Sequence, residues 1–370
     1  MLNSITEYCT ACGACNNICP NKCITMIADD EGFLYPNIDE DQCTNCNLCK
    51  QVCPVLNKSV CKNELSPMVY AAWSLDNEVR FDSTSGGIFT ELANYVILQG
   101  GYVVGARYNS SHLVEHYIIS DMEEICLLRQ SKYVQSEIGF VLKDIKELLD
   151  NEELVMFVGT PCEGAGLLSF LNKDYDNLLL CDFICRGSNS PKAYLKYLDS
   201  IKKKYNSKIK KVWFKNKKDG WNKFCTKIEF ENGSEYYADR YTDLYMRGYL
   251  KYNLYMRPSC SNCSFKGFPR NSDLTLGDFW GVKLNDESID TDRGTSLVII
   301  NSQKGKKYFE NIDDQIFKQE NAIDKAISFN QCGIDSVMKG NKRNYFFEKI
   351  DSMDFEELMT SIINTGLVKG

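Results

Sequence analysis

The chain has 370 residues, of which 44% are apolar and 25% are charged, and its formal net charge is -7. The length predicts two or three domains, and the composition indicates folded domains rather than disorder. The negative charge argues against nucleic acid as a main partner, and no apolar run approaches the ~20 residues that span a bilayer, so we expect no membrane span.

Cysteine is the unusual residue of this chain. Eighteen cysteines occur, and ten of them precede residue 62. The N-terminal segment has neither the basic start nor the long apolar core of a secretion signal, which predicts a cytoplasmic protein. In a reducing compartment, clustered cysteines indicate metal binding or redox chemistry rather than disulfides. We therefore expect an electron-transfer protein of an anaerobic, reducing cytoplasm.

Two cysteine runs with the same spacing lie in the first sixty residues. In each run three cysteines are separated by two residues, and a fourth follows three residues later and precedes proline. Three thiolates on one tight loop can bind a 4Fe-4S cluster, whose fourth ligand comes from the other run, whereas zinc sites more often show cysteine pairs. The spacing predicts a ferredoxin-like domain at 1–60 with two 4Fe-4S clusters, one at Cys9, Cys12, Cys15 and Cys53, the other at Cys43, Cys46, Cys49 and Cys19. Cys23 and Cys61 fit neither run and are interpreted as bystanders.

Strands and helices alternate after a connector at 57–67. Apolar patterning predicts strands at 68–75, 102–107, 115–119, 154–158 and 178–184. Helical spacing of apolar residues predicts helices at 88–98, 138–149 and 191–203. Strands dominate 211–238, and the last forty residues are interpreted as helices. The pattern predicts an α/β (mixed α+β) core built on a mixed sheet, in two parts at 66–152 and 153–320, followed by a helical tail at 321–370.

Several familiar signals are missing or weak. No GxGxxG or GxxxxGK[ST] motif occurs, and the glycine-rich segment 159–166 lacks the lysine of a phosphate loop. The only histidines, His112 and His116, are expected to be surface or core residues rather than catalysts. The lysine-rich region 202–218 is interpreted as a solvated face, with a docking patch for an acidic ferredoxin or a phosphorylated substrate as the alternative.

Four cysteines of the core stand out by their positions. Cys162 and Cys185 each follow an expected strand, and Cys260 and Cys263 form a close pair. Together they could hold a third cluster. On spacing alone, buried structural cysteines with a zinc-binding or unoccupied pair fit about as well.

At these residues the chain resembles the beta subunits of coenzyme F420 hydrogenases and dehydrogenases, and it looks like the bacterial branch associated with sugar-polymer biosynthesis. The resemblance runs in order over roughly residues 1–305 and rests on these stretches: STSGG at 83–87, SKYVQS at 131–136, GTPC at 159–162, DFICRG at 182–187, the Cys260–Cys263 pair, DLTLGDFWG at 273–281 and GTSL at 294–297. It implies a flavin, usually FAD, in the α/β core. It also implies a nearby cluster, which favours a third 4Fe-4S site at Cys162, Cys185, Cys260 and Cys263, with Cys181 as the alternative to Cys185.

The resemblance also implies flavin-binding residues. Ser85, Gly86 and Gly87 open an expected helix, where free backbone N–H groups favour a phosphate, although a simple cap and turn has the same appearance. The other implied contacts are Ser131, Lys132 and Tyr133, with Lys132 offering a positive charge to the flavin, and the hydroxyls of Thr295 and Ser296.

The implied function is that of an iron–sulfur flavoprotein oxidoreductase. Clusters exchange single electrons and a flavin exchanges one or two, which would permit hydride transfer to or from an organic substrate or a deazaflavin-like coenzyme. The expected partners are ferredoxin or another redox protein and an organic hydride acceptor or donor. The alternative is a non-catalytic electron-relay subunit of a larger redox complex, which the resemblance would link to polysaccharide biosynthesis. Arg129, Asp278 and Tyr133 are candidate acids or bases, and the sequence does not choose among them.

Overall fold

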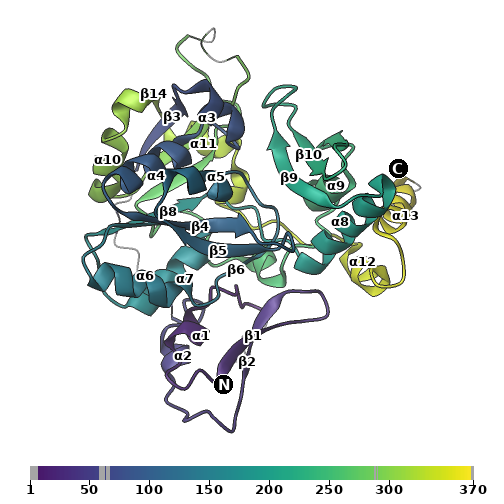
Figure 1. Ribbon diagram of the computed structural model, residues 1–370, viewed down its shortest axis with the longest axis horizontal. Coiled ribbons are helices and arrows are strands. Elements are labelled where there is room, and N and C mark those ends of the chain that lie inside the picture. The colour runs from purple at the N-terminus through teal and green to yellow at the C-terminus, as the bar shows by residue number, and fades with distance from the viewer. Residues whose placement is uncertain (1–6, 58–62, 64–66, 287–288, 290, 368–370) are drawn as a thin grey trace.

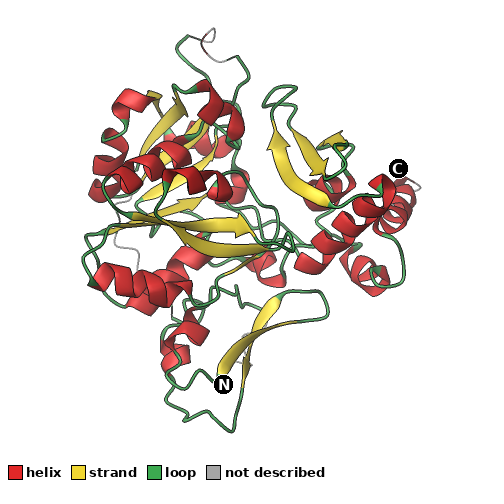
Figure 2. Ribbon diagram, viewed as in Figure 1, coloured by secondary structure: helices red, strands yellow, loops and turns green. Residues whose placement is uncertain are grey.

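The computed structural model describes residues 7–57, 63, 67–286, 289 and 291–367 (Figure 1). Three parts are visible: an N-terminal module, a large sheet covered by helices on both faces, and a smaller sheet surrounded by helices near the C-terminus (Figure 2). Cys61 lies outside the described residues. No helix in the described ranges is long and apolar enough to cross a bilayer.

The N-terminal module combines two short helices with one antiparallel strand pair. The residue before helix α1 is Gly13, whose φ of 73° lies in the left-handed region. Glycine suits this position because it adopts that conformation easily. The strands pair so that Ile24 lies opposite Ile38. The elements in chain order are α1 (Ala14–Ile18), β1 (Ile24–Ala28), β2 (Leu34–Ile38) and α2 (Leu48–Gln51).

Within the described residues, nine strands form the large sheet in the order β14-β3-β13-β12-β8-β7-β4-β5-β6. Neighbours in the central run β12-β8-β7-β4 are parallel, so their carboxyl ends meet at one edge. The strands are β3 (Met68–Ser74), β4 (Tyr102–Tyr108), β5 (Val114–Ile119), β6 (Ser136–Glu137), β7 (Val155–Val158), β8 (Leu178–Phe183), β12 (Leu274–Asp278), β13 (Ser296–Ile300) and β14 (Ile316–Asn321). Segments 66–152 and 153–320 therefore both contribute to one sheet.

Both faces of the central strands are buried, which explains their continuous apolar runs. Met156 and Leu179 pack on one face with α4, while Phe157 and Leu180 pack on the other with α6 and α7. Figure 1 shows α4 and α5 above the sheet and α6 and α7 below it, next to the N-terminal module. The helices are α3 (Asn77–Asp82), α4 (Ile88–Leu98), α5 (Ile125–Leu128), α6 (Val141–Asp150), α7 (Pro161–Leu171), α10 (Gln303–Glu310) and α11 (Ile323–Ser328).

A smaller unit carries its own aromatic core. Tyr194, Tyr245 and Phe214 pack together between its sheet and its helices. Its elements are α8 (Pro191–Tyr205), β9 (Ile209–Asn216), β10 (Cys225–Phe230), β11 (Glu235–Asp239), α9 (Leu244–Leu250), a 3-10 turn at Pro258–Asn262, α12 (Arg343–Lys349) and α13 (Phe355–Leu367). The strands β9, β10 and β11 form an antiparallel sheet.

The predicted α/β class, built on a mixed sheet behind a ferredoxin-like module, is confirmed. One expectation is wrong in part, because the lysine-rich region 202–218 is not a uniformly solvated face. Lys215 and Lys217 on and after β9 are only 4% and 5% exposed. Both amines have polar partners inside the molecule, so packing between the small and large sheets overrides the polar appearance of this stretch.

Candidate functional site

The first cysteine site lies in the N-terminal module. Its cavity of about 20 Å³ is lined by small and apolar residues and by the cysteines of one predicted set, namely Cys9, Cys12, Cys15 and Cys53. The backbone N–H of Ala11 donates to Cys9 Sγ at 3.4 Å, a contact that stabilises a thiolate. The chain thus brings the four cysteines of this set to one cavity.

The second predicted set is looser. Cys19, Cys43 and Cys49 share one small apolar cluster, whereas Cys46 is exposed. Cys23, interpreted as a bystander, lies with its sulfur 3.3 Å from that of Cys19. A thiol that belongs to neither run is therefore a direct neighbour of this set.

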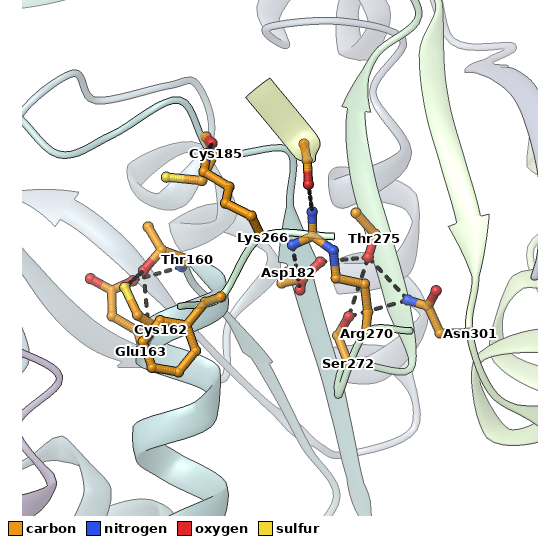
Figure 3. A network of polar contacts seen from close by, with 12 residues as sticks. Thr160, Cys162, Glu163, Asp182, Cys185, Lys266, Arg270, Ser272, Thr275 and Asn301 are labelled. Carbon is orange, nitrogen blue, oxygen red and sulfur yellow. Dashed lines mark hydrogen bonds and ion pairs between the residues drawn. The ribbon is translucent and has the colours of Figure 1, made fainter. Parts of the chain in front are cut away.

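A third cysteine site is assembled in the core from distant segments. Cys162 lies in the first turn of α7, whose start is fixed by a capping box between Thr160 and Glu163. Cys185 follows β8 (Figure 3). One cavity of about 40 Å³ is lined by all members of the dispersed set, Cys162, Cys185, Cys260 and Cys263. Cys181, the alternative to Cys185, packs in the apolar core instead.

Backbone donors support this third site. Ser188 N–H donates to Cys260 Sγ at 3.4 Å, and Phe265 N–H donates to Cys263 Sγ at 3.4 Å. Burial raises the pKa of the Cys162 thiol well above its usual value. Such thiols stay protonated unless a positive centre binds them. Within the described ranges, no three His, Cys, Asp or Glu side chains converge tightly enough for a single metal ion.

Basic side chains surround the same cavity. Lys266 donates to the carbonyl oxygen of Cys185, and Arg270 pairs with buried Asp182 at 3.4 Å. Thr275 donates to Asp182 at 2.6 Å, and Asn301 donates to Thr275, so the ion pair belongs to a buried network (Figure 3). Among the described residues that line the cavity, the charged ones are Arg186, Arg257, Lys266, Arg270 and Glu163. The net charge of this wall is positive.

A much larger cavity, of about 420 Å³, opens at the carboxyl ends of the parallel strands. Its wall includes residues of β4, β7, β8 and β12. This edge is where open α/β sheets bind ligands, and the volume lies in the usual range for a small-molecule pocket. The N-terminal turn of α4, from Gly87 to Phe89, also lines it, and no side chain at the N-cap, Gly87, accepts from its backbone N–H groups, which are of the kind that bind phosphate.

Most of the predicted flavin contacts lie on this wall, although they come from three distant segments. The predicted residues that line the cavity are Ser85, Gly87, Ser131, Lys132, Tyr133 and Ser296. Thr84 accepts from Ser131 N–H at 2.8 Å, and Ser296 Oγ accepts from Gly86 N–H at 2.9 Å. These bonds fasten the segments to one another.

Two predicted contacts lie behind the wall. A Cβ at Gly86 would come within 2.4 Å of the carbonyl oxygen of Ala72, so glycine is needed here for close packing against β3. Thr295 is fully buried, and its carbonyl accepts from Ser85 Oγ at 2.7 Å. Both residues hold the loop in place rather than facing the cavity.

Lys132 lies on the cavity wall, but its amine is engaged with its own loop. Nζ donates to the carbonyl of Arg129 at 2.7 Å and contacts those of Leu128 and Gln130. Burial lowers the pKa of Lys132 to about 7. The amine therefore closes the end of α5 and is easily neutralised.

Sequence reasoning missed an ion pair that also lines the large cavity. Lys215 on β9 pairs with Asp278 at the end of β12, and Asp278 also accepts from Trp221 Nε1 at 3.3 Å. Burial alone would lower the pKa of Lys215, but the charge of Asp278 outweighs it and the pKa is raised. Trp280, stacked on Trp221 at 4.3 Å, lies beside this pair. Asp278 stood within the stretch DLTLGDFWG, but nothing in the sequence linked it to Lys215.

His116 is buried and also lines the large cavity. Its Nδ1 lies 2.8 Å from Ser136 Oγ, and its Nε2 lies 3.8 Å from a carboxylate oxygen of Glu163. Burial lowers the pKa of His116, which keeps the ring neutral near pH 7. The expected core position is thus combined with access to the cavity.

The three cavities are neighbours, because each shares wall residues with the next. Thr10 lines both the first cysteine cavity and the core cysteine cavity. Cys185 lines both the core cysteine cavity and the large cavity. The order of sites is therefore N-terminal cysteines, core cysteines and large cavity.

The fold and the cysteine sites define an iron–sulfur oxidoreductase. A 4Fe-4S dicluster domain matches residues 8–57. The N-terminal and C-terminal models of the coenzyme F420 hydrogenase/dehydrogenase beta subunit match residues 69–143 and 152–326, which together make up more than half of the chain. The chain belongs to this family, as the resemblance predicts.

No curated protein matches the chain. Among solved structures, one matching chain comes from the F420-reducing NiFe hydrogenase complex of Methanosarcina barkeri. It is 17% identical, and the match covers 81% of this chain and 92% of that chain with a TM-score of 0.45.

Proposed function

We propose that the chain is a flavin-dependent iron–sulfur oxidoreductase with three 4Fe-4S clusters and one FAD-type flavin, and that it transfers hydride to or from an organic substrate. When bound, the clusters would supply single electrons and the flavin would exchange electrons in pairs. The observation that carries the proposal is the shared wall at Cys185, which joins the core cysteine cavity to the large cavity.

The residues of the core cysteine cavity fit an anionic cluster. Four thiolates around an iron–sulfur core leave a net negative charge, and the basic wall formed by residues such as Lys266 and Arg270 offsets it. The N–H groups that donate to Cys260 and Cys263 would stabilise their thiolates. A zinc site is less well supported, because zinc–sulfur bonds of about 2.3 Å need more tightly converging sulfurs.

The residues of the large cavity fit a flavin. The start of α4 at Gly87 offers backbone donors to a phosphate, and the hydroxyls of Ser85 and Ser131 lie nearby on the wall. Arg129 Nε, a buried N–H donor of a lining residue, has no hydrogen-bond partner among the described atoms. A bound ligand would satisfy such donors.

The Lys215–Asp278 pair would handle the organic substrate. Asp278 holds the Lys215 ammonium in place, and the rings of Trp280 and Phe224 flank it at 5.2 and 5.0 Å. A planar substrate with a carbonyl or carboxylate group would stack on the rings and accept a hydrogen bond from Nζ. Lys215 would thus orient the substrate and hold a proton beside it.

The test is the flavin and iron content of anaerobically purified protein. We expect close to one flavin per chain, released by acid and measured by fluorescence, and about twelve irons. Ser131→Trp would fill the large cavity and should lose flavin while keeping iron, whereas Ser111→Trp on an exposed turn should keep both. Intact clusters without any flavin would overturn the enzyme proposal and leave an electron-relay subunit as the better description.

A further inference from the structure

Arg257 lies between the two four-cysteine cavities and is only 1% exposed. It precedes the turn that carries Cys260, and its side chain reaches into the N-terminal module. Nε donates to the carbonyl oxygen of Cys9 at 2.7 Å, and one terminal nitrogen donates to that of Leu34 at 2.9 Å. The other terminal nitrogen donates to Gln135 Oε1 at 3.0 Å.

All of these acceptors are neutral. Within the described residues, no carboxylate forms an ion pair with Arg257, although buried Arg343 at the same module contact pairs with Glu31. A buried guanidinium without a counter-charge is costly. Asp29 lies close enough to interact with the charge of Arg257 but does not pair with it, so the position of Arg257 indicates further negative charge nearby.

The two cysteine sites are placed to supply it. Arg257 lines the core cavity formed by Cys162, Cys185, Cys260 and Cys263. Through Cys9 it also holds the loop that bounds the N-terminal cavity, and the ring of Tyr35 lies 4.2 Å from its guanidinium. Arginine suits this place because its planar fork donates in several directions at once, which a lysine ammonium on a flexible stem does less well.

We propose that Arg257 is a positioning residue that acts as a shared counter-charge for two clusters, the one at Cys9, Cys12, Cys15 and Cys53 and the one in the core cavity. It holds the two sites side by side and raises both midpoint potentials. This inference rests on the proposed function, since it requires a cluster in the core cavity. The cluster at Cys43, Cys46, Cys49 and Cys19 has no contact with Arg257 and keeps its potential.

The experiment is an EPR-monitored redox titration of the full-length, anaerobically purified protein. Arg257→Gln removes the charge but retains an amide donor for the Cys9 carbonyl. We expect the midpoints of two clusters to fall by about 59 mV or more, a tenfold change in a one-electron equilibrium, and the third to stay unchanged. Arg257→Lys keeps the charge, so its two midpoint potentials should stay close to those of the wild type.

Arg343→Met is the matched control, because Arg343 is also buried at the module contact but is paired with Glu31. It should leave all three midpoints unchanged even if it lowers stability. Unchanged midpoints in Arg257→Gln with full iron content would overturn the proposal. If Arg257→Gln loses clusters but Arg257→Lys retains them, the result supports the counter-charge role of Arg257. If both variants lose clusters equally, Arg257 has only a packing role. Eight irons in the wild type would instead refute the third cluster itself.

Discussion

The N-terminal and core cysteine sites differ in how the chain brings their cysteines together. Cys9, Cys12 and Cys15 lie on one tight loop, and Cys53 reaches them from a repeat of the same run. In the core, about a hundred residues separate Cys162 from Cys263, and their approach requires the ends of β7 and β8 and the segment after α9. The first site depends on local spacing, whereas the second depends on the large sheet.

Their charge environments also differ. None of the described residues that line the N-terminal cavity of Cys9, Cys12, Cys15 and Cys53 is charged, whereas the core cavity has a basic wall. A positive wall stabilises the more negative, reduced state of a cluster. We therefore expect the core cluster to have the higher midpoint potential. The fold-dependent site thus gains both its cysteines and its electrostatic environment from distant segments.

The largest expected effect comes from Cys185→Ala. The variant removes one member of the core site, so we expect it to lose about one third of the bound iron while the N-terminal EPR signals persist. Iron analysis and EPR of anaerobic protein measure this. Cys181→Ala is the matched control, because Cys181 lies four residues earlier, on β8, and packs in the apolar core. Full iron in Cys185→Ala, or a loss confined to Cys181→Ala, would contradict the assignment.

The next effect concerns the network that supports the core site. Asp182→Asn would remove the buried carboxylate that pairs with Arg270, and breaking such a pair costs about 3–5 kcal/mol. We expect denaturant unfolding, followed by tryptophan fluorescence, to show this loss, and iron to be released first from the core site.

The control for Asp182→Asn is Glu115→Gln, which removes one member of the half-exposed Arg107–Glu115 pair. Such pairs contribute about 1 kcal/mol or less. If both variants lose a similar free energy of unfolding, the buried network contributes no more to stability than the half-exposed pair does.

A smaller effect separates the two sites by potential. Lys266 donates to the carbonyl of Cys185, and of these two cysteine cavities it lines the core one and not the N-terminal one. Lys266→Met should therefore lower one midpoint, by about 59 mV if the equilibrium changes tenfold, while Arg257→Gln lowers two. Lys208→Met, at an exposed lysine of the small-sheet unit, should change none. A shift of the N-terminal midpoints in Lys266→Met would show that the sites do not differ in charge as described.

The sequence predicted what depends on local pattern. The cysteine runs, the helix at 88–98 and the strands β4, β7 and β8 all have signals within a few residues. It could not predict that Lys215 forms an ion pair with Asp278, because the pair joins strands of two different sheets. Nor could it show that Gly86 packs against β3 instead of facing the cavity, since only the approach of Ala72 reveals this. The core cysteines stood out by their positions in the sequence, but only the family resemblance favoured a third cluster over buried structural cysteines.

The smallest expected effect concerns the charge of Lys132 on the wall of the large cavity. It tests whether burial in the folded chain sets that charge. The folded chain holds Lys132 at a pKa of about 7, whereas the ordinary value is 10.5. Between these values the unfolded chain binds more protons, so this lysine makes the free energy of unfolding rise with pH; below about pH 7 its contribution is constant. Lys132→Met should reduce that slope by up to about 1.4 kcal/mol per pH unit, while Lys208→Met should not.

Flavin sharpens the same measurement. If the anionic groups of FAD lie beside Lys132, binding will raise its pKa toward the ordinary value, because an opposite charge favours the ammonium. Added FAD should then flatten the pH dependence of unfolding in the wild type but leave that of Lys132→Met unchanged. The three carbonyls that accept from Nζ already show that the amine need not reach the ligand. An equal response to FAD in both proteins would therefore show that Lys132 only stabilises its own loop. The anionic groups of FAD would then be bound by the start of α4.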